Sequence, residues 1–276
     1  VVLEETGKTL VSSPLIPTVL VGATAIVQLG NEAQKQVLLP KIVAGELLTA
    51  LALDEHTNHN PSKIATTATK VDGGYSLNGS KTFVLDGHIA NMLIVVARTS
   101  AETDSEQGIS LFLVDANAEG LNVARTIMVD SRNSSNIQFN NVVVAEDALL
   151  GEKDQGFNGL DSVLDIARIG IAAEMLGSMQ AVFESILEFL KQREQFGVLI
   201  GSFQGLQHRA AEMYSEIELC KSAVRAALAG LDEPDTTQAE IAVLASMTKA
   251  KLSEVFFLVS NEGIQMHGGI GMTDEF

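Results

Sequence analysis

The spacing of hydrophobic positions changes twice along the chain and divides it into three zones. In the first zone, residues 1–46, these positions recur at the interval of a helix. A serine pair just before Pro14 can cap one helix, and Asn31 can cap a second, because short oxygen-bearing side chains accept hydrogen bonds from first-turn N–H groups. Pro40 and Gly45 are expected to end the second helix.

Short runs rich in β-branched residues characterise the second zone, residues 47–150. The runs are residues 48–53, 64–71, 75–77, 92–97, 109–114 and 137–144. Asp72-Gly73-Gly74 and Asn78-Gly79 are hairpin signals, because glycine reaches positive φ without a Cβ clash. This zone is therefore expected to be a compact antiparallel β-domain, with the acidic, serine-rich residues 100–107 as a solvated loop.

Helical spacing returns in the third zone, residues 151–276. Residues 157–192 predict one very long helix, and Ser202 can cap a second. Thr237 and Glu240 form a capping box that opens a third helix. Three long helices in succession predict an antiparallel bundle. The fold class is therefore α+β: a helical N-terminal part, a middle antiparallel β-domain and a C-terminal helix bundle.

Charge narrows the range of partners. The 276 residues include 18 Lys and Arg against 35 Asp and Glu, a net charge of −17 with His neutral. So acidic a chain is not expected to bind nucleic acid phosphates or an anionic membrane surface.

Cysteine usage and apolar stretches indicate the compartment. The lone Cys220 excludes a disulfide framework and favours a reducing, cytoplasmic location. The longest apolar stretch, residues 15–27, is too short for a membrane span and is interrupted by Pro17. The chain has no initiating Met and stops soon after a glycine-rich run, so we expect it to be a piece of a longer protein.

Asp165 and Arg168 are the first candidate for chemistry. A spacing of three places both side chains on one helix face, where they can pair or grip one ligand. The alternative is an ordinary surface ion pair that stabilises the helix by about 0.5 kcal/mol.

Arg193 at the end of the long helix is the second candidate. Gln204, Gln207 and His208 lie in the first turns of the next helix, so an Arg beside amide side chains and unpaired N–H groups suits a phosphate. The alternative is that Arg193 only complements the negative end of the helix dipole.

The glycine-rich run after the third helix is the third candidate. Gln265 precedes Gly268 and Gly269, and such small residues let backbone N–H groups approach an anion. Ordinary C-capping by glycine is the alternative. Because the run follows a helix rather than a strand, a Rossmann site is not expected.

Metal and triad chemistry have little support. His56 and His59 share a loop, but no third ligand stands at a recognised spacing, so no metal is expected. Asp86 and His88 have no nucleophile beside them, and Cys220 lies among apolar neighbours, so neither predicts a triad.

Three motifs in this order are more specific than any one alone. They are Arg-Glu-Gln-Phe-Gly at 193–197, Phe-Gln-Gly-Leu-Gln-His at 203–208 and His-Gly-Gly-Ile-Gly at 267–271. With the helical and β zones before them, they resemble the acyl-CoA dehydrogenase family of flavoproteins across essentially the whole chain. Family members extend beyond both ends, so the chain is expected to be truncated at both. The domains implied are 1–46, 47–150 and 151–276, the last incomplete.

The resemblance implies FAD, held partly by a neighbouring subunit in a homo- or hetero-oligomer built as a dimer of dimers. It implies that Arg193 binds the pyrophosphate and that Asp165 and Arg168 recognise the adenine end of CoA and the thioester region. The remaining positions implied around the adenosine end and the glycine-rich contact are Gln195, Phe196, Gln204, Gln265, Gly268 and Gly269.

The β-domain departs from the family pattern. The run at 53–59 replaces the usual Thr-Glu-Pro-Gly type, and Phe83-Val84-Leu85 replaces Trp-Ile-Thr over the flavin ring. Phe83 can still stack on the ring, and the backbone N–H groups of Leu53 and Leu85 can still bond flavin oxygens.

No catalytic base is assigned within the chain. Most family members carry the base downstream of the glycine-rich element, which places it beyond Phe276. A minority carry it on the long helix, at the position of Ala167, which cannot serve.

The activity implied is FAD-dependent α,β-dehydrogenation of an acyl-CoA to the 2,3-enoyl-CoA, with an electron-transfer flavoprotein as acceptor. Two alternatives stay open. One is a non-catalytic partner subunit of a heteromeric dehydrogenase, and the other is an oxygen-using oxidase or monooxygenase of the same fold.

Overall fold

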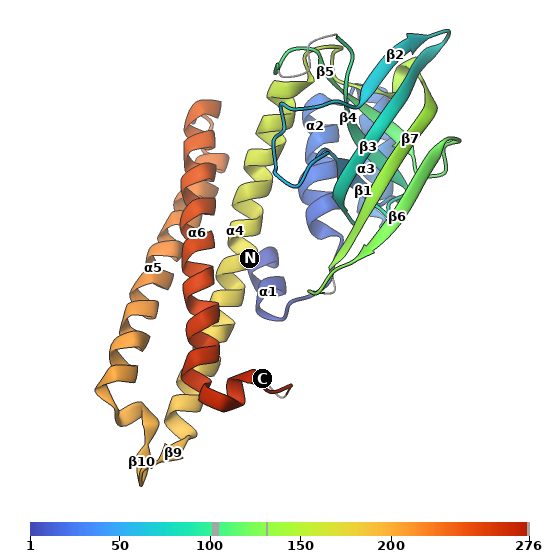
Figure 1. Cartoon of the computed structure of the whole chain (residues 1–276). Helices are drawn as coiled ribbons and strands as arrows, with labels where there is room; N and C mark the ends of the chain where they lie inside the picture. Colours follow the sequence, from blue (N-terminus) through green and yellow to red (C-terminus); the bar gives the residue numbers. More distant parts are fainter. Residues whose placement is uncertain (101–104, 131, 275–276) are drawn as a thin grey trace. The chain divides into compact units, whose positions relative to one another are not determined.

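The structure, a computed structural model, describes residues 1–100, 105–130 and 132–274. The chain divides into two compact units, each with its own hydrophobic core (Figure 1). The β-unit is Ser12–Leu164, and the helical unit combines Val1–Val11 with Asp165–Phe276. The solvated loop expected at 100–107 lies partly outside the described residues. The three-part division into 1–46, 47–150 and 151–276 stays a prediction.

Helices open the β-unit. They are the π-helix η1 (Leu15–Ala23), α2 (Thr24–Leu29) and α3 (Glu32–Val43). The cap expected at Asn31 is confirmed, since its side chain accepts from the Gln34 N–H at 2.9 Å and the Gln34 side chain accepts from the Asn31 N–H at 3.0 Å. The expectation that Pro40 ends this helix is wrong, because Pro40 lies inside it. Pro40 and Gln36 are both exposed, so water can satisfy the carbonyl that loses its partner.

A single eight-stranded sheet forms the core of this unit. Its strands are β1 (Thr49–Ala52), β2 (Thr67–Val71), β3 (Gly74–Leu85), β4 (Met92–Arg98), β5 (Ile109–Asp115), β6 (Leu121–Ile127), β7 (Asn133–Ala145) and β8 (Leu149–Leu150), the last preceded by the 3-10 turn η2 (Glu146–Ala148). The order is β6-β7-β3-β2-β4-β5-β8, with β1 beside β4. The α+β class is confirmed. The sheet is mixed rather than purely antiparallel, since β1 and β2 each pair with β4 in parallel.

The two glycine signals have different outcomes. Asp72 and Gly73 connect β2 to β3 in a tight turn, with Gly73 at φ 74°, as expected. The second expected turn is wrong, because Gly79 lies inside β3 at φ 148°. There the register against β7 shifts between Leu77 and Gly79, so the glycine marks a β-bulge.

Long helices form the helical unit. They are α4 (Gly156–Gln192), which begins in the β-unit, α5 (Gln204–Asp232) and α6 (Gln238–His267). Short elements complete the unit: α1 (Val2–Lys8), β9 (Glu194–Gln195), β10 (Val198–Leu199), and the 3-10 turns η3 (Ile200–Ser202) and η4 (Gly268–Met272). The three long helices run down, up and down in succession (Figure 1), which confirms the antiparallel bundle.

Of the two caps predicted for the bundle helices, one is confirmed and one is wrong. Thr237 and Glu240 form the expected capping box at the start of α6. Ser202 does not cap α5, because Phe203 is the N-cap residue and makes no side-chain bond. The Ser202 hydroxyl instead donates to the Leu199 carbonyl at 2.7 Å and closes the turn η3.

Helix α4 is the core helix of the bundle. By length and composition it could cross a membrane, but half of its most apolar 18-residue stretch is buried inside the structure. Buried side chains of α4, α5 and α6 share one apolar cluster, which includes Leu176, Cys220 and Leu252. Close packing against α1 requires Gly177, because a Cβ there would overlap the Glu4 carbonyl. The apolarity of α4 therefore serves helix packing.

Candidate functional site

Asp165 and Arg168 form an anchored ion pair on α4. Arg168 Nη1 lies 2.6 Å from Asp165 Oδ1, and Gln238 Nε2 donates to Asp165 Oδ2 at 3.1 Å. The Asp165 side chain is 1% exposed, whereas that of Arg168 is 28% exposed. The pair is thus not an ordinary surface ion pair, because its carboxylate is buried and held by α6. Sequence reasoning missed Gln238, the first residue of α6.

A short hairpin after α4 carries the second group of candidates. Strands β9 and β10 pair antiparallel, and Phe196 and Gly197 form the turn with φ values of 56° and 77°. The Phe196 ring is 93% exposed, and it meets Phe203 edge-on at a centroid distance of 6.4 Å. An aromatic pair this exposed is typical of a surface that binds another group.

Three polar candidates flank this aromatic pair in the sequence. Arg193 is exposed, and its guanidinium has no hydrogen bond or ion pair with any residue in the described ranges. Gln195 donates to the Glu194 carbonyl at 2.7 Å, and Gln204 is exposed at the start of α5. An exposed guanidinium near exposed rings suits a ligand with an anionic group and a flat ring.

The glycine-rich candidates follow the end of α6. Gly268 is the C-cap residue with φ 62°, so the capping alternative explains this glycine. It does not explain Gly269, which has no positive φ and open space where a Cβ would lie. Gln265 is exposed beside them. Open backbone at Gly269 is accessible to a ligand or to another chain.

His267 lies at the same end of α6 and is largely buried. Its Nδ1 lies 2.7 Å from the Gly263 carbonyl oxygen, and its ring is 4.4 Å from that of Phe189. With Gly271 it lines a pocket of about 320 Å³ between α4 and α6.

The end of strand β3 carries the β-unit candidates. Phe83 is 54% exposed and Leu85 is 50% exposed, whereas Val84 between them is buried. The first two therefore present one apolar surface, which suits the face of a planar ring. Leu53 is buried as a whole residue, and its carbonyl accepts from Lys81 at 2.9 Å.

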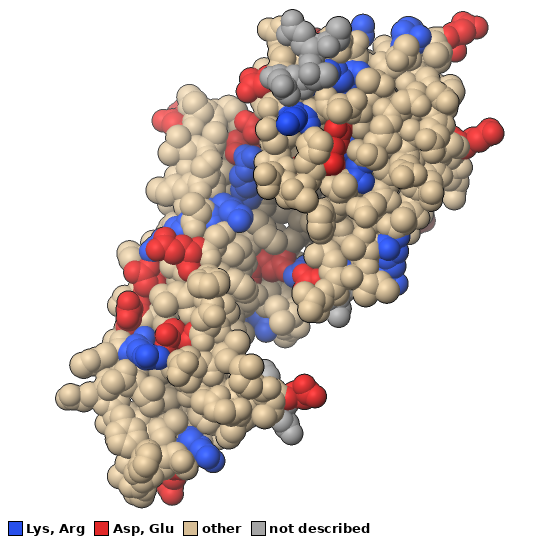
Figure 2. All heavy atoms as spheres, in the orientation of Figure 1, with Lys and Arg blue, Asp and Glu red and all other residues tan. Residues whose placement is uncertain are grey.

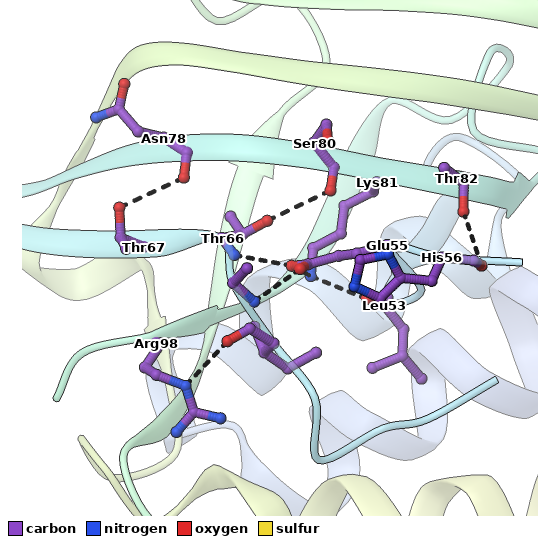
Figure 3. A network of polar contacts seen from close by, with 12 residues as sticks. Leu53, Glu55, His56, Thr66, Thr67, Asn78, Ser80, Lys81, Thr82 and Arg98 are labelled. Atoms are coloured by element: carbon purple, nitrogen blue, oxygen red, sulfur yellow. Dashed lines mark hydrogen bonds and ion pairs between the residues drawn. The ribbon is translucent and has the colours of Figure 1, made fainter. Parts of the chain in front are cut away.

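A buried ion pair between Lys81, two residues before Phe83 on β3, and Glu55 was missed in the sequence (Figure 3). The Lys81 ammonium is fully buried and lies 2.8 Å from Glu55 Oε1. Burial lowers the pKa of Lys81 to about 8, although the Glu55 carboxylate opposes the change. Burial alone would raise the pKa of Glu55, but Lys81 and the Thr66 N–H more than offset it, so its pKa lies below its usual value. Both groups are therefore charged at neutral pH.

Other titratable candidates take different roles. His59 Nδ1 contacts Asp54 Oδ1 at 3.0 Å. Within the described residues no group of His, Cys, Asp and Glu is arranged to hold a metal ion. Cys220 is buried in the bundle, and burial raises the pKa of its thiol to about 11, so it is not a nucleophile at neutral pH.

Comparison with known proteins gives consistent matches. Residues 51–142 match the family model described as acyl-CoA dehydrogenase, middle domain, and residues 154–276 match that described as acyl-CoA dehydrogenase, C-terminal domain. An acyl-CoA dehydrogenase of Bacillus subtilis (strain 168) is 33% identical over 260 residues, 93% of this chain and 67% of that protein. The short-chain specific acyl-CoA dehydrogenase of Megasphaera elsdenii is 34% identical over 273 residues, 96% of this chain and 70% of that protein.

The solved structures agree. Butyryl-CoA dehydrogenase from Megasphaera elsdenii is similar with a TM-score of 0.90 and 31% identity, covering 99% of this chain and 72% of that one. The chain spans between 60% and 70% of the length of the curated relatives that it matches here.

Proposed function

Because the chain belongs to the acyl-CoA dehydrogenase family, we propose that its protein catalyses FAD-dependent α,β-dehydrogenation of an acyl-CoA thioester to the 2,3-enoyl-CoA. The observation that carries the proposal is the exposed Arg193 guanidinium, followed by the exposed rings of Phe196 and Phe203. A dinucleotide with a diphosphate and a flat base is the kind of ligand that such a surface binds.

Each candidate side chain has a proposed task. Phe83 and Leu85 bind the flavin ring, whose chemistry when bound is to accept a hydride. Arg193 holds the pyrophosphate, and Gln195 and Gln204 contact the adenosine end. Gln265, Gly268 and Gly269 approach the cofactor through amide and backbone groups.

Asp165 and Arg168 bind the substrate in this proposal. The buried carboxylate, fixed by Gln238, holds the guanidinium in one orientation, so that it meets the anionic CoA without losing much side-chain entropy. The base that removes the α-proton is not assigned to any described residue, and Ala167 offers no carboxylate.

We infer an electron-transfer flavoprotein as electron acceptor, a dimer-of-dimers assembly and a cytoplasmic location. The net charge of −17 repels anionic ligands rather than attracting them. Acidic and basic side chains are also interspersed on the face that Figure 2 shows, so this face has no broad basic surface. Binding therefore depends on local cations such as Arg168 and Arg193.

An anaerobic titration tests the function. The full-length protein is loaded with FAD, and acyl-CoA esters of increasing chain length are added while the visible absorbance of the flavin is recorded. We expect bleaching with at least one ester, and Arg168→Met should raise the ester concentration for half-bleaching about tenfold or more. Lys249→Met, on an exposed position of α6, is the charge-matched control. Absence of flavin binding and of bleaching with every ester would refute the proposal.

A non-catalytic partner subunit is the second candidate. Two residues favour this candidate. Leu85 is aliphatic where catalytic members of the family are expected to have a hydroxyl, and Ala167 has no carboxylate. Copurification with a second related chain would support this candidate, and a homotetramer with full flavin occupancy would exclude it. Peroxide formation under air would instead indicate an oxidase or monooxygenase.

A further inference from the structure

Lys81 connects two segments that are far apart in the sequence. It lies on β3, its ammonium is fully buried, and it donates to the Leu53 carbonyl at 2.9 Å and to Glu55 Oε1 at 2.8 Å (Figure 3). Leu53 follows the last residue of β1 directly. One charged group of β3 therefore fixes the path of the chain as it leaves β1.

Glu55 extends this connection to the start of β2. Its Oε2 accepts from the Ala65 N–H at 2.7 Å, and its Oε1 accepts from the Thr66 N–H at 2.9 Å. The carboxylate is 5% exposed, so these are charge-assisted bonds in a dry environment. The pair thus holds the loop between β1 and β2 at both of its ends.

The strand changes course immediately after Lys81. Thr82 donates its N–H to the Asp54 carbonyl at 2.7 Å, and its hydroxyl donates to the His56 carbonyl at 3.4 Å. The register of β3 against β7 shifts between Lys81 and Val84, and Phe83 adopts φ 51°. A positive φ at a non-glycine residue is strained and persists only where neighbouring contacts determine it.

This bulge is what exposes Phe83. Thr82 and Phe83 together lie opposite the single residue Asn136 of β7, and after this bulge Phe83 and Leu85 are exposed while Val84 is buried. The apolar surface therefore depends on a bulge whose preceding residue is the buried lysine.

Stability alone does not explain a buried ion pair at this position. Removing two charges from water costs about as much as their attraction returns, and apolar side chains of similar volume are often equally stable. What the pair provides in addition is a single arrangement of the segments it connects.

We propose that the Lys81–Glu55 ion pair is a positioning element for the flavin ring. It sets the backbone of Leu53 and the bulge at Thr82 and Phe83, so that the apolar surface of Phe83 and Leu85 meets the ring in one geometry. Neither side chain contacts the ring, and the inference rests on the proposed function, since it requires that FAD binds here.

Four variants of the full-length protein separate positioning from simple stabilisation. Lys81→Met leaves the Glu55 carboxylate buried without its cation. Lys81→Met combined with Glu55→Gln removes both charges, while the Gln amide oxygen can still accept from Ala65 and Thr66. Glu55→Asp keeps the charge and shortens the side chain. Lys70→Met is the matched control, because Lys70 pairs with Glu146 at 2.7 Å on the exposed surface of the same sheet.

Three measurements are made on each protein: the urea midpoint of the FAD-free form, the dissociation constant for FAD from the quenching of flavin fluorescence on binding, and the visible spectrum of the bound flavin. We expect the double variant to recover most of the midpoint lost in Lys81→Met, yet to bind FAD about tenfold or more weakly and with a shifted spectrum. Lys70→Met should match the wild type in all three.

The outcomes are distinct. A double variant with wild-type FAD affinity and spectrum would overturn the positioning role. If Lys81→Met and the double variant do not fold, Glu55→Asp decides: unchanged FAD affinity and spectrum overturn the role, and weaker binding with a shifted spectrum supports it. If the wild-type protein itself binds no FAD, the proposed function fails.

Discussion

The buried Lys81 ammonium makes the free energy of unfolding depend on pH in a calculable way. Its pKa is lowered from 10.5 to about 8 in the folded protein by burial, against the attraction of Glu55 and Asp54. Between these two values the unfolded chain binds a proton that the folded protein has lost. Stability must therefore rise with pH in this window, because the unfolded state is the one that binds more protons.

The size of the effect follows from the two pKa values. Each unit of pKa difference corresponds to about 1.4 kcal/mol, so Lys81 contributes on the order of 2 to 3 kcal/mol of added stability between pH 7 and about pH 10. Glu55 adds nothing in this window, since its pKa lies below 4.5 and it stays ionised. Cys220 acts in the opposite direction, because its pKa is raised from 9.0 to about 11 and the thiol disfavours ionisation in the folded state.

A difference measurement isolates Lys81 from Cys220 and from every other group. Urea unfolding of the wild type and of the double variant Lys81→Met, Glu55→Gln is followed by far-ultraviolet circular dichroism at several pH values and constant ionic strength, because the chain has no Trp to serve as a fluorescent probe. The wild-type free energy minus that of the variant should increase by on the order of 2 to 3 kcal/mol from pH 7 to about pH 10. Parallel curves would show that Lys81 does not titrate as a desolvated ammonium.

Three further predictions concern the candidate site and the bundle. Phe83→Trp gives this Trp-free chain a single Trp, whose emission FAD should quench on binding. Phe257→Trp, on an exposed position of α6, should be quenched far less in titrations at equal concentration. Gly269→Ala should leave the urea midpoint of the FAD-free protein unchanged, since no neighbouring atom lies within 4 Å of the new Cβ. It should weaken FAD binding, measured by titration of flavin fluorescence, and an unchanged affinity would show that Gly269 is not part of the site. Thr237→Ala should lower the free energy of unfolding by about 1 kcal/mol in the same urea assay through loss of the α6 cap, with Thr237→Ser close to wild type.

Much of the fold could be predicted because local chemistry determines it. The predicted cap at Asn31 and the predicted capping box at Thr237 require only a few residues in order, and both occur. Gly79 shows the limit of such reasoning. A glycine with positive φ serves a turn and a bulge equally well, and only the pairing of β3 with β7 decides between them.

Strand pairing across the sheet could not be predicted either, because it depends on contacts between distant segments. The parallel pairing of β1 with β4 joins segments whose partners lie 43 residues apart, such as Thr49 and Met92, and no local pattern specifies it. Strand β6 (Leu121–Ile127) was missed because it is an edge strand with mostly exposed or half-buried side chains. Such a strand lacks the apolar run by which buried strands are identified.

The candidate site divides along the same line. The motif residues Arg193 and Phe196 could be proposed from their order, because the motif is continuous in the sequence. Gln238 and Glu55 could not, since each acts on a residue of another element: Gln238 on Asp165, 73 positions away, and Glu55 on Lys81, 26 positions away. No local pattern distinguishes Lys81, because Gly79 and Phe83, two positions away on either side, are both exposed.

These two pairs address one physical problem. Under the proposed function, a chain of net charge −17 binds anionic ligands against its own long-range repulsion, and a flexible cation would lose side-chain entropy each time it contacted one. Asp165 restrains Arg168 before any ligand arrives, and Glu55 restrains Lys81 in the same way. The difference is exposure: the Arg168 side chain, 28% exposed, reaches the surface and suits contact with an anion, whereas Lys81, fully buried, can act only through the backbone that it holds. Asp165 thus favours anion binding in two ways: its own negative charge is buried rather than presented to the ligand, and it orients the Arg168 guanidinium.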